Sequence, residues 1–324
     1  MSFNQTDGAS SAPFSVVGRE PVARFAPSPT GSLHAGSLLA AVGSYLDARA
    51  SGARWLVRIE DLDTARVIPG CEDQMLRTLE AYGFEWDGQI IRQSERRDAY
   101  REALSALAAP HRTFRCSCSR KDLAGVDEES QGYPGTCREG PAMDGPTAVR
   151  FRVADDIVRF DDLFQGSQAF DTRRLGDFVI ERRDGIASYQ LAVVVDDDWQ
   201  GVTRVVRGAD LLASTPWQLE LQGALGMSRP IYGHLPLLTE AGGEKLSKSK
   251  RAVPIPFVQE TAGRSELLAV SQALTSTLTH LSQAPPPELA HSSIKDVWKW
   301  AVAHWTPQAL VGRTQVQLSA PGDK

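Results

Sequence analysis

The spacing of apolar residues predicts alternating strands and helices in the first part of the chain. Residues 22–26 and 55–59 are short apolar runs that fit buried strands. Between them, apolar residues recur at helical spacing over residues 36–50. A strand, a helix and a second strand in this order form a βαβ unit, which builds a parallel sheet. The pattern therefore predicts an α/β fold.

The same criteria predict further elements along the chain. Helices are expected at residues 71–82, 94–108 with Ser94 as cap, and 215–225 with Thr215 as cap. Strands are expected at residues 148–153, 157–160, 191–195 and 202–206. Residues 178–180 and 187–189 flank Asp184-Gly185, which predicts a hairpin. After Lys250 the chain is expected to be helical, apart from a loop at residues 285–287.

Loss of this periodicity marks the expected domain limits. Residues 1–18 predict a flexible tail, and residues 110–147, rich in Cys, Gly and Pro, predict an inserted subdomain. We therefore expect a catalytic domain made of residues 19–109 and 148–255, with a short helical region at residues 256–324.

Composition restricts the class of protein. The net charge of −5 argues against a chain whose main task is non-specific binding of nucleic acid. No apolar run reaches the roughly 18 residues that cross a bilayer, and residues 1–11 do not look like a secretory signal. We expect a cytoplasmic, monomeric enzyme without membrane contact.

One candidate phosphate site follows the first strand. His34 and Gly36 stand where a proline-stiffened loop enters the helix expected at residues 36–50. A helix N-terminus offers free N–H groups to phosphate, Gly36 permits close approach of backbone, and His34 could donate a hydrogen bond. The alternative is an ordinary turn with a buried histidine.

A second candidate phosphate site lies near residue 245. Lys245 and Lys248 alternate with serines after Gly242-Gly243, so this loop could close over a polyphosphate. The alternative is an exposed basic loop.

Three of the four cysteines form a cluster in the sequence. Cys116, Cys118 and Cys137 fall within 22 positions, which suits a local metal site in a reducing compartment better than a disulfide framework. A structural zinc site needs a fourth ligand, and three reduced cysteines without metal are the alternative. Cys71 stands apart and is expected to be a core residue at a helix start.

Together these motifs resemble class I aminoacyl-tRNA synthetases. Residues 34–36 resemble the HIGH signature, although Ser37 replaces its final histidine, and residues 245–249 resemble the KMSKS loop. The flanks at residues 24–31, 57–61, 189–196 and 206–210 resemble glutamyl-type synthetases. The resemblance covers about residues 22–255. It implies a Rossmann-like core with His34, Gly36, Lys245 and Lys248 as catalytic residues. ATP, accompanied by Mg²⁺, would be bound by His34, Gly36 and Lys248.

The resemblance also implies an L-glutamate site. The residues at the family's amino-acid-binding positions are Arg24, Phe25, Ala26, Pro27, Ser28, Glu60, Tyr189 and Arg207. Arg24 and Arg207 would pair with carboxylates, and Glu60 would pair with the ammonium group. Tyr189 would donate a hydrogen bond. Asp61 and Asp63 are expected to hold their loop together.

The cysteine cluster narrows the resemblance. The spacing Cys-x-Cys…Tyr-x₃-Cys is similar to the zinc site of the glutamyl-queuosine tRNA(Asp) synthetases. It implies Zn²⁺ bound by Cys116, Cys118, Tyr133 and Cys137, with His111 as the alternative fourth ligand. Only 75 residues follow Ser249, fewer than a full anticodon-binding domain needs.

The implied reaction is activation of glutamate with ATP, without tRNA, and transfer to the queuosine base of tRNA(Asp). Three alternatives remain: a truncated glutamyl- or glutaminyl-tRNA synthetase that charges the terminal adenosine, a small nucleotidylyltransferase, and a non-enzymatic RNA-binding relative.

Overall fold

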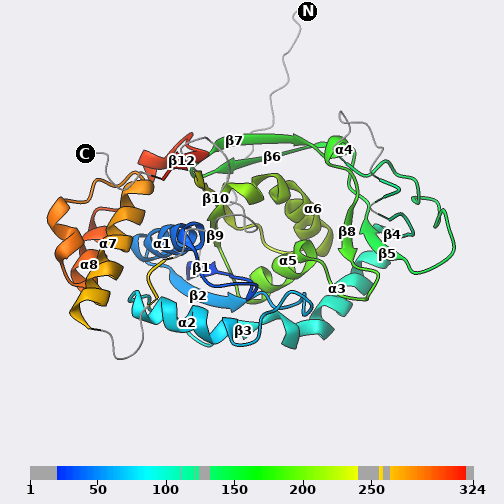
Figure 1. Cartoon of the computed structure of the whole chain (residues 1–324). Helices are drawn as coiled ribbons and strands as arrows, with labels where there is room; N and C mark the ends of the chain where they lie inside the picture. Colours follow the sequence, from blue (N-terminus) through cyan, green and yellow to red (C-terminus); the bar gives the residue numbers. More distant parts are fainter. Residues whose placement is uncertain are drawn as a thin grey trace, which may run out of the picture.

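The computed structural model describes residues 20–109, 111–119, 121–123, 132–239, 255–257 and 263–318 (Figure 1). The strands are β1 Val22–Phe25, β2 Arg54–Ile59, β3 Ile91–Arg92, β4 Thr113–Cys116, β5 Ala148–Phe151, β6 Ile157–Asp162, β7 Gly166–Asp171, β8 Phe178–Glu181, β9 Arg204–Gly208, β10 Ile231–Leu235, β11 Leu237–Thr239 and β12 Gln315–Gln317. The α-helices are α1 Ala35–Ala50, α2 Cys71–Ala81, α3 Arg97–Ala108, α4 Thr172–Leu175, α5 Tyr189–Trp199, α6 Thr215–Leu225, α7 Arg264–His280 and α8 Ile294–Ala303. Short 3-10 helices are η1 Gln93–Arg96, η2 Ala209–Ser214, η3 Pro287–His291 and η4 Pro307–Leu310.

A seven-stranded sheet forms the centre of the molecule. Its strand order is β3-β2-β1-β9-β10-β6-β7, and every neighbouring pair is parallel except β6 with β7. Sequence order reverses beside β1, because β2 follows on one side and β9 lies on the other. In open α/β sheets, ligands bind outside the carboxyl ends of the strands at such a point. The α/β prediction is confirmed.

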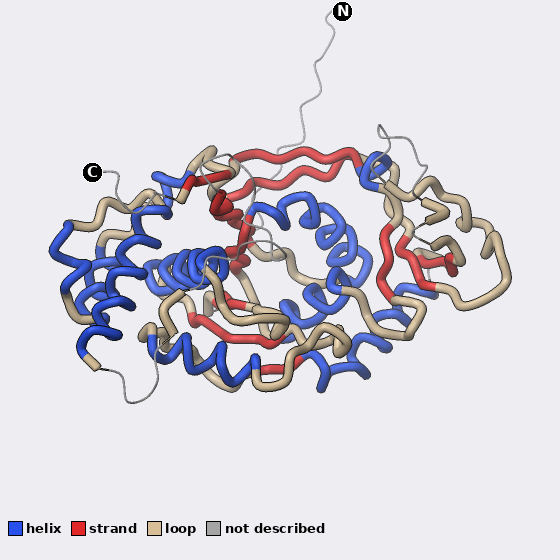
Figure 2. The backbone as a smooth tube through the Cα atoms, in the orientation of Figure 1, coloured by secondary structure: helices blue, strands red, loops and turns tan. Residues whose placement is uncertain are grey.

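Helices cover both faces of the central strands (Figure 2). On one side α1 shares a hydrophobic core with α7 and α8, and on the other side α3, α5 and α6 form a second core. In the first core the rings of Tyr45, Phe84 and Trp298 pack edge to face, with centroids 4.7–5.3 Å apart. The indole Nε1–H of Trp298 also donates to the Tyr82 carbonyl at 2.8 Å. Residues near the C-terminal end of the chain therefore complete the core around the first helix.

A small antiparallel sheet lies at the edge of the molecule. Its strand order is β4-β5-β8. β4 falls within residues 110–147, the predicted insertion, whereas β5 and β8 lie outside those limits. The insertion is thus tied to the rest of the chain through backbone hydrogen bonds, and its limits remain a prediction. Among the described residues, no helix is long and apolar enough to cross a membrane.

Most predicted elements are present within one or two residues of their expected ends. The predicted strand over residues 191–195 is wrong, because Tyr189–Trp199 is helix α5. This run is rich in valine, and Leu191 through Val195 are all buried in the core shared with α3 and α6. A run buried on all sides carries no alternation, so periodicity cannot separate strand from helix, and tertiary packing overrides the preference of valine for strands.

Three smaller predictions also need correction. The hairpin around Asp184-Gly185 has β8 as its first strand, but its second strand reduces to one bridge between Glu181 and Ala187, because Tyr189 starts α5. Ser94 lies in η1, and α3 begins only at Arg97. Thr215 is the first residue of α6 and not its cap, and its hydroxyl accepts a hydrogen bond from a buried arginine described below.

Candidate active site

A cavity of about 670 Å³ lies at the carboxyl ends of the central strands. It is bounded by the loop from β1 to α1, the end of β2, the first turn of α5 and the end of β9. All eight predicted glutamate-binding residues and His34 line it: Arg24, Phe25, Ala26, Pro27, Ser28, Glu60, Tyr189, Arg207 and His34. The motifs that contain these nine residues thus converge on one cavity. Lys245 and Lys248 lie outside the described residues.

His34 caps the first helix. Its Nδ1 accepts the backbone N–H of Gly36 at 3.1 Å and of Ser37 at 3.3 Å. The neutral imidazole therefore carries its proton on Nε2, as a hydrogen-bond donor. A Cβ added at Gly36 would lie 3.1 Å from the His34 ring, which explains the glycine there. The first turn of α1 contains no acidic residue, so its positive dipole end can receive an anion.

Arg24 is buried beside the cavity and has a carboxylate partner. Its Nε donates to Oδ1 of Asp197 at 3.1 Å, and the side chain is 3% exposed. The same oxygen of Asp197 lies 2.8 Å from Nη1 of Arg58. Asp197 therefore compensates two buried guanidinium groups at once, and burying such charges is tolerable only when they are paired.

Arg58 joins this pair to the cavity. It is fully buried in β2 and lies 3.6 Å from Oε1 of Glu60, while its Nη1 donates to Gln200 at 2.6 Å. Next to it, Asp196 is buried and accepts hydrogen bonds from Gln93, Arg96 and Tyr100 at 2.7–2.8 Å. Arg58, Asp196 and Asp197 had no predicted role. A charged residue inside a buried apolar strand is the signal that could have revealed this network.

Glu60 is a largely buried carboxyl that lines the cavity. Burial raises its pKa to about 7, although Arg58 and Arg24 act in the opposite direction and stabilise the carboxylate. Its backbone N–H donates to the Pro27 carbonyl at 2.9 Å, which holds the end of β2 against the loop after β1. A carboxyl poised near neutral pH is suited to a cationic partner, because the partner shifts it to the charged form.

Arg207 is held differently from Arg24. Its Nε donates to Nε2 of His234 at 3.0 Å, one Nη to Thr215 Oγ1 at 2.8 Å, and the other Nη to the Tyr189 hydroxyl at 3.3 Å. All of these partners are neutral acceptors. None of the ion pairs formed within the described part of the chain includes Arg207. The cavity thus contains a buried guanidinium whose charge is not cancelled by a neighbouring carboxylate.

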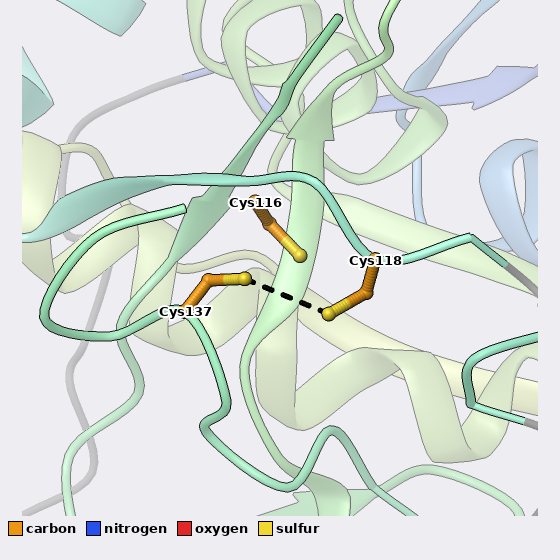
Figure 3. Close-up of side chains that lie close together, drawn as sticks. All are labelled: Cys116, Cys118 and Cys137. Atoms are coloured by element: carbon orange, nitrogen blue, oxygen red, sulfur yellow. Dashed lines mark hydrogen bonds between the residues drawn. The ribbon is translucent and has the colours of Figure 1, made fainter. Parts of the chain in front are cut away.

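Three cysteines gather at the end of β4 (Figure 3). The sulfur atoms of Cys116, Cys118 and Cys137 all lie within 4.8 Å of one another, and those of Cys118 and Cys137 are 3.5 Å apart. The Tyr133 hydroxyl lies 3.4 Å from the Cys116 sulfur and 3.8 Å from the Cys118 sulfur. Tetrahedral zinc with sulfur ligands needs sulfur atoms roughly 3.8 Å apart. Three thiols and one phenol therefore fit a zinc site.

The charges around this cluster agree with metal binding. Burial raises the pKa of Cys137, but hydrogen bonds from Tyr133, from backbone N–H groups and from Cys118 outweigh it and bring the value to about 6. Burial raises the pKa of Cys118 to about 11 and that of Tyr133 still further. A bound dication lowers the pKa of its ligands, so zinc would favour their charged forms. His111 is exposed and lies outside the group, which favours Tyr133 as the fourth donor.

Two smaller predictions, about Cys71 and about the loop after β2, agree with the structure. Cys71 begins α2 and is 4% exposed, as expected for a core residue at a helix start. Asp61 accepts hydrogen bonds from the backbone and hydroxyl of Ser94 at 2.8 and 2.5 Å. Asp63 pairs with Arg66 at 2.7 Å and with Arg182 at 2.9 Å. Both acids hold the loop after β2 in place.

Comparison with known proteins gives consistent matches over most of the chain. Residues 21–270 match the family model described as tRNA synthetases class I (E and Q), catalytic domain. A Pseudomonas aeruginosa protein named glutamyl-Q tRNA(Asp) synthetase is 51% identical over 285 residues, 88% of this chain and 93% of the relative. Proteins of the same name are 50% identical in Geobacter sulfurreducens, over 89% of this chain and 93% of the relative, and 48% identical in Dechloromonas aromatica, over 92% and 98%.

The fold has solved counterparts. The crystal structure of glutamate-tRNA synthetase from Elizabethkingia anophelis superposes with a TM-score of 0.76 at 24% identity, and the match covers 93% of this chain and 68% of that one. Methionyl-tRNA synthetase of Mycobacterium tuberculosis superposes with a TM-score of 0.54 at 17% identity, over 80% of this chain and 64% of that one. These structures support the assignment of the fold.

Proposed function

This chain belongs to the catalytic-domain family of class I tRNA synthetases for glutamate and glutamine, and we propose that it activates L-glutamate with ATP and transfers the glutamyl group to the queuosine base of tRNA(Asp). The observation that carries this proposal is the cavity. It brings the guanidinium groups of Arg24 and Arg207 and the carboxyl of Glu60 next to the N-terminus of α1. Relatives at about 50% identity that bear the name glutamyl-Q tRNA(Asp) synthetase support the acceptor.

Glutamate complements the charges of this cavity. It carries two carboxylates and one ammonium group, and guanidinium forks are well suited to carboxylates. Arg207, which has no ion-pair partner among the described residues, is the stronger candidate for a substrate carboxylate, whereas Arg24 already shares Asp197. Glu60 faces the ammonium group, and Tyr189 and Ser28 supply hydroxyls.

In the first step, an α-carboxylate oxygen of glutamate forms a bond to the α-phosphorus of ATP. The bond from that phosphorus to the bridging oxygen breaks, and pyrophosphate leaves with the electron pair. The protein contributes position and charge and forms no covalent bond. Nε2–H of His34 and the positive dipole end of α1 stabilise the phosphates from one side. Lys245 and Lys248 are assigned to the other side by the KMSKS-like motif.

In the second step, a nucleophilic group of the queuosine base loses its proton and forms a bond to the carbonyl carbon of glutamyl-adenylate. The bond from that carbon to the phosphate oxygen breaks, and AMP leaves with the electron pair. Mg²⁺ accompanies ATP in the first step in this proposal.

We also propose that Cys116, Cys118, Tyr133 and Cys137 bind Zn²⁺ as a structural site. Four protein donors leave no open position for a substrate, in contrast to catalytic zinc. When bound, the ion would tie the end of β4 to the segment that contains Tyr133 and Cys137.

A stem-loop assay tests the acceptor. Purified protein with ATP and glutamate should exchange pyrophosphate without any RNA, and it should then glutamylate a queuosine-containing anticodon stem-loop that has no acceptor stem. The same stem-loop with guanosine in place of queuosine is the matched control and should remain unmodified. Glutamylation only of intact tRNA at its terminal adenosine would instead identify a truncated glutamyl-tRNA synthetase.

A further inference from the structure

A buried hydrogen-bond network connects Arg207 to His234 and Asp162. Arg207 on β9 and His234 on β10 are direct partners in the parallel register, so their side chains project from the same face of the sheet. Asp162, the last residue of β6, lies on the next strand along. The three side chains therefore cross three neighbouring strands at their carboxyl ends.

The hydrogen bonds of this network fix the tautomer of His234. Its Nδ1 lies 2.5 Å from Oδ2 of Asp162, and its Nε2 accepts Nε–H of Arg207 at 3.0 Å. The guanidinium can only donate, so Nε2 must be unprotonated and the proton lies on Nδ1. Oδ1 of Asp162 is itself held by backbone N–H groups of Phe164, Gln165 and His234 at 2.9–3.0 Å. The carboxylate is thus a rigid anchor for the ring.

A neutral imidazole has a specific advantage at this place. A carboxylate on Nε of Arg207 would form an ion pair and compete with the substrate for the charge of the guanidinium. Both His234 and Asp162 are buried, so water does not replace either contact. The network thus orients the guanidinium without neutralising it, whereas Arg24 is paired directly with a carboxylate.

We propose that His234 is a positioning residue that, anchored by Asp162 in its Nδ1–H tautomer, orients Arg207 and reserves its charge for a carboxylate of glutamate. This inference rests on the proposed function, because it assigns Arg207 to that substrate. It predicts that loss of the Nε2 acceptor weakens binding of glutamate selectively and leaves binding of ATP unchanged.

Two variants of His234 separate its two nitrogen atoms. Gln can place an acceptor at the position of Nε2, whereas Asn can replace only Nδ1–H and leaves Arg207 without its partner. In glutamate-dependent pyrophosphate exchange, we expect His234→Asn to raise the KM for glutamate at least tenfold, equivalent to about 1.4 kcal/mol. Its kcat should stay within about threefold and its KM for ATP within about twofold of the native values. His234→Gln should keep the KM for glutamate within about threefold.

Three results would overturn the proposal. They are a native KM for glutamate in both variants, an equal rise of that KM in both variants, or a proportional change of kcat and of both KM values. If either buried substitution prevents folding, ¹⁵N-labelled histidine in the native protein decides. The spectrum should contain a neutral ring with an exchange-protected proton on Nδ1 and a bare Nε2, and a proton on Nε2 of that ring would refute the inference. If the native protein shows no glutamate-dependent exchange, the proposed function fails, and the spectrum still tests the tautomer.

Discussion

The pKa of Glu60 makes binding of glutamate dependent on pH in a range that is easily measured. The carboxyl titrates near pH 7 in the fold against an ordinary value of 4.5, because burial favours its neutral form. An ammonium partner requires the carboxylate, so binding below pH 7 must first remove a proton. For a single group with this pKa, the KM for glutamate should rise roughly tenfold from pH 8 to pH 6.

The same pKa shift affects the stability of the fold, which is higher at low pH, whereas binding of glutamate is tighter at high pH. Since the fold favours neutral Glu60, the stability present at low pH is lost as the pH rises from about 4.5 through 7. A shift from 4.5 to about 7 corresponds to about 3 kcal/mol. Glu60→Gln keeps a neutral side chain at every pH. Its free energy of unfolding, relative to the native protein, should therefore improve by about 2.5 kcal/mol between pH 5 and pH 8.

Two measurements check this reasoning. The KM for glutamate of Glu60→Gln should be independent of pH between 6 and 8 and raised about tenfold or more at pH 8, because a charge-assisted hydrogen bond is lost. Urea unfolding at the two pH values gives the stability. Glu72→Gln, which removes a half-buried ion pair between α2 and Arg92, is the matched control and should show neither effect. A flat KM profile in the native protein would refute the assigned pKa or the contact with ammonium.

Further predictions concern the other parts of the site. Asp197→Asn should destabilise the protein by about 3–5 kcal/mol in urea unfolding, because two buried guanidinium groups lose their shared carboxylate. Zinc analysis of purified protein should find one ion per chain. Cys118→Ser should lower that stoichiometry and the midpoint of thermal unfolding, while glutamate-dependent pyrophosphate exchange persists. An unchanged midpoint after zinc loss would contradict a structural role. His34→Ala and Lys248→Ala should each lower the rate of adenylate formation by about 100-fold without a change in circular dichroism, and unchanged rates would remove them from the phosphate site.

The sequence located the cavity because short motifs place its residues on successive strand ends. Arg24 lies near the end of β1, Glu60 follows β2, and Arg207 lies near the end of β9, so a parallel sheet brings them to one edge. Their convergence follows from topology and from the family resemblance. The βαβ unit was predictable for the same reason, since its periodicity is local.

The network behind the cavity could not be predicted in this way. Arg24 and Asp197 are 173 residues apart, and Asp162 and His234 are 72 residues apart, so no local spacing indicates either contact. Both depend on how the strands are ordered in the sheet. Helix α5 was missed for a related reason, because burial on every side removed the periodicity that distinguishes a helix from a strand.

The packing of Trp298 limits how far this protein could be shortened. Its ring lies against Tyr45 of α1 and Phe84. A fragment that ends before α7 would lack this ring and leave a cavity in the core beside α1, the helix that begins after His34. Loss of one buried tryptophan side chain alone typically costs about 3–5 kcal/mol. A minimal glutamate-activating fragment should therefore be designed to retain α7 and α8 as part of its catalytic domain.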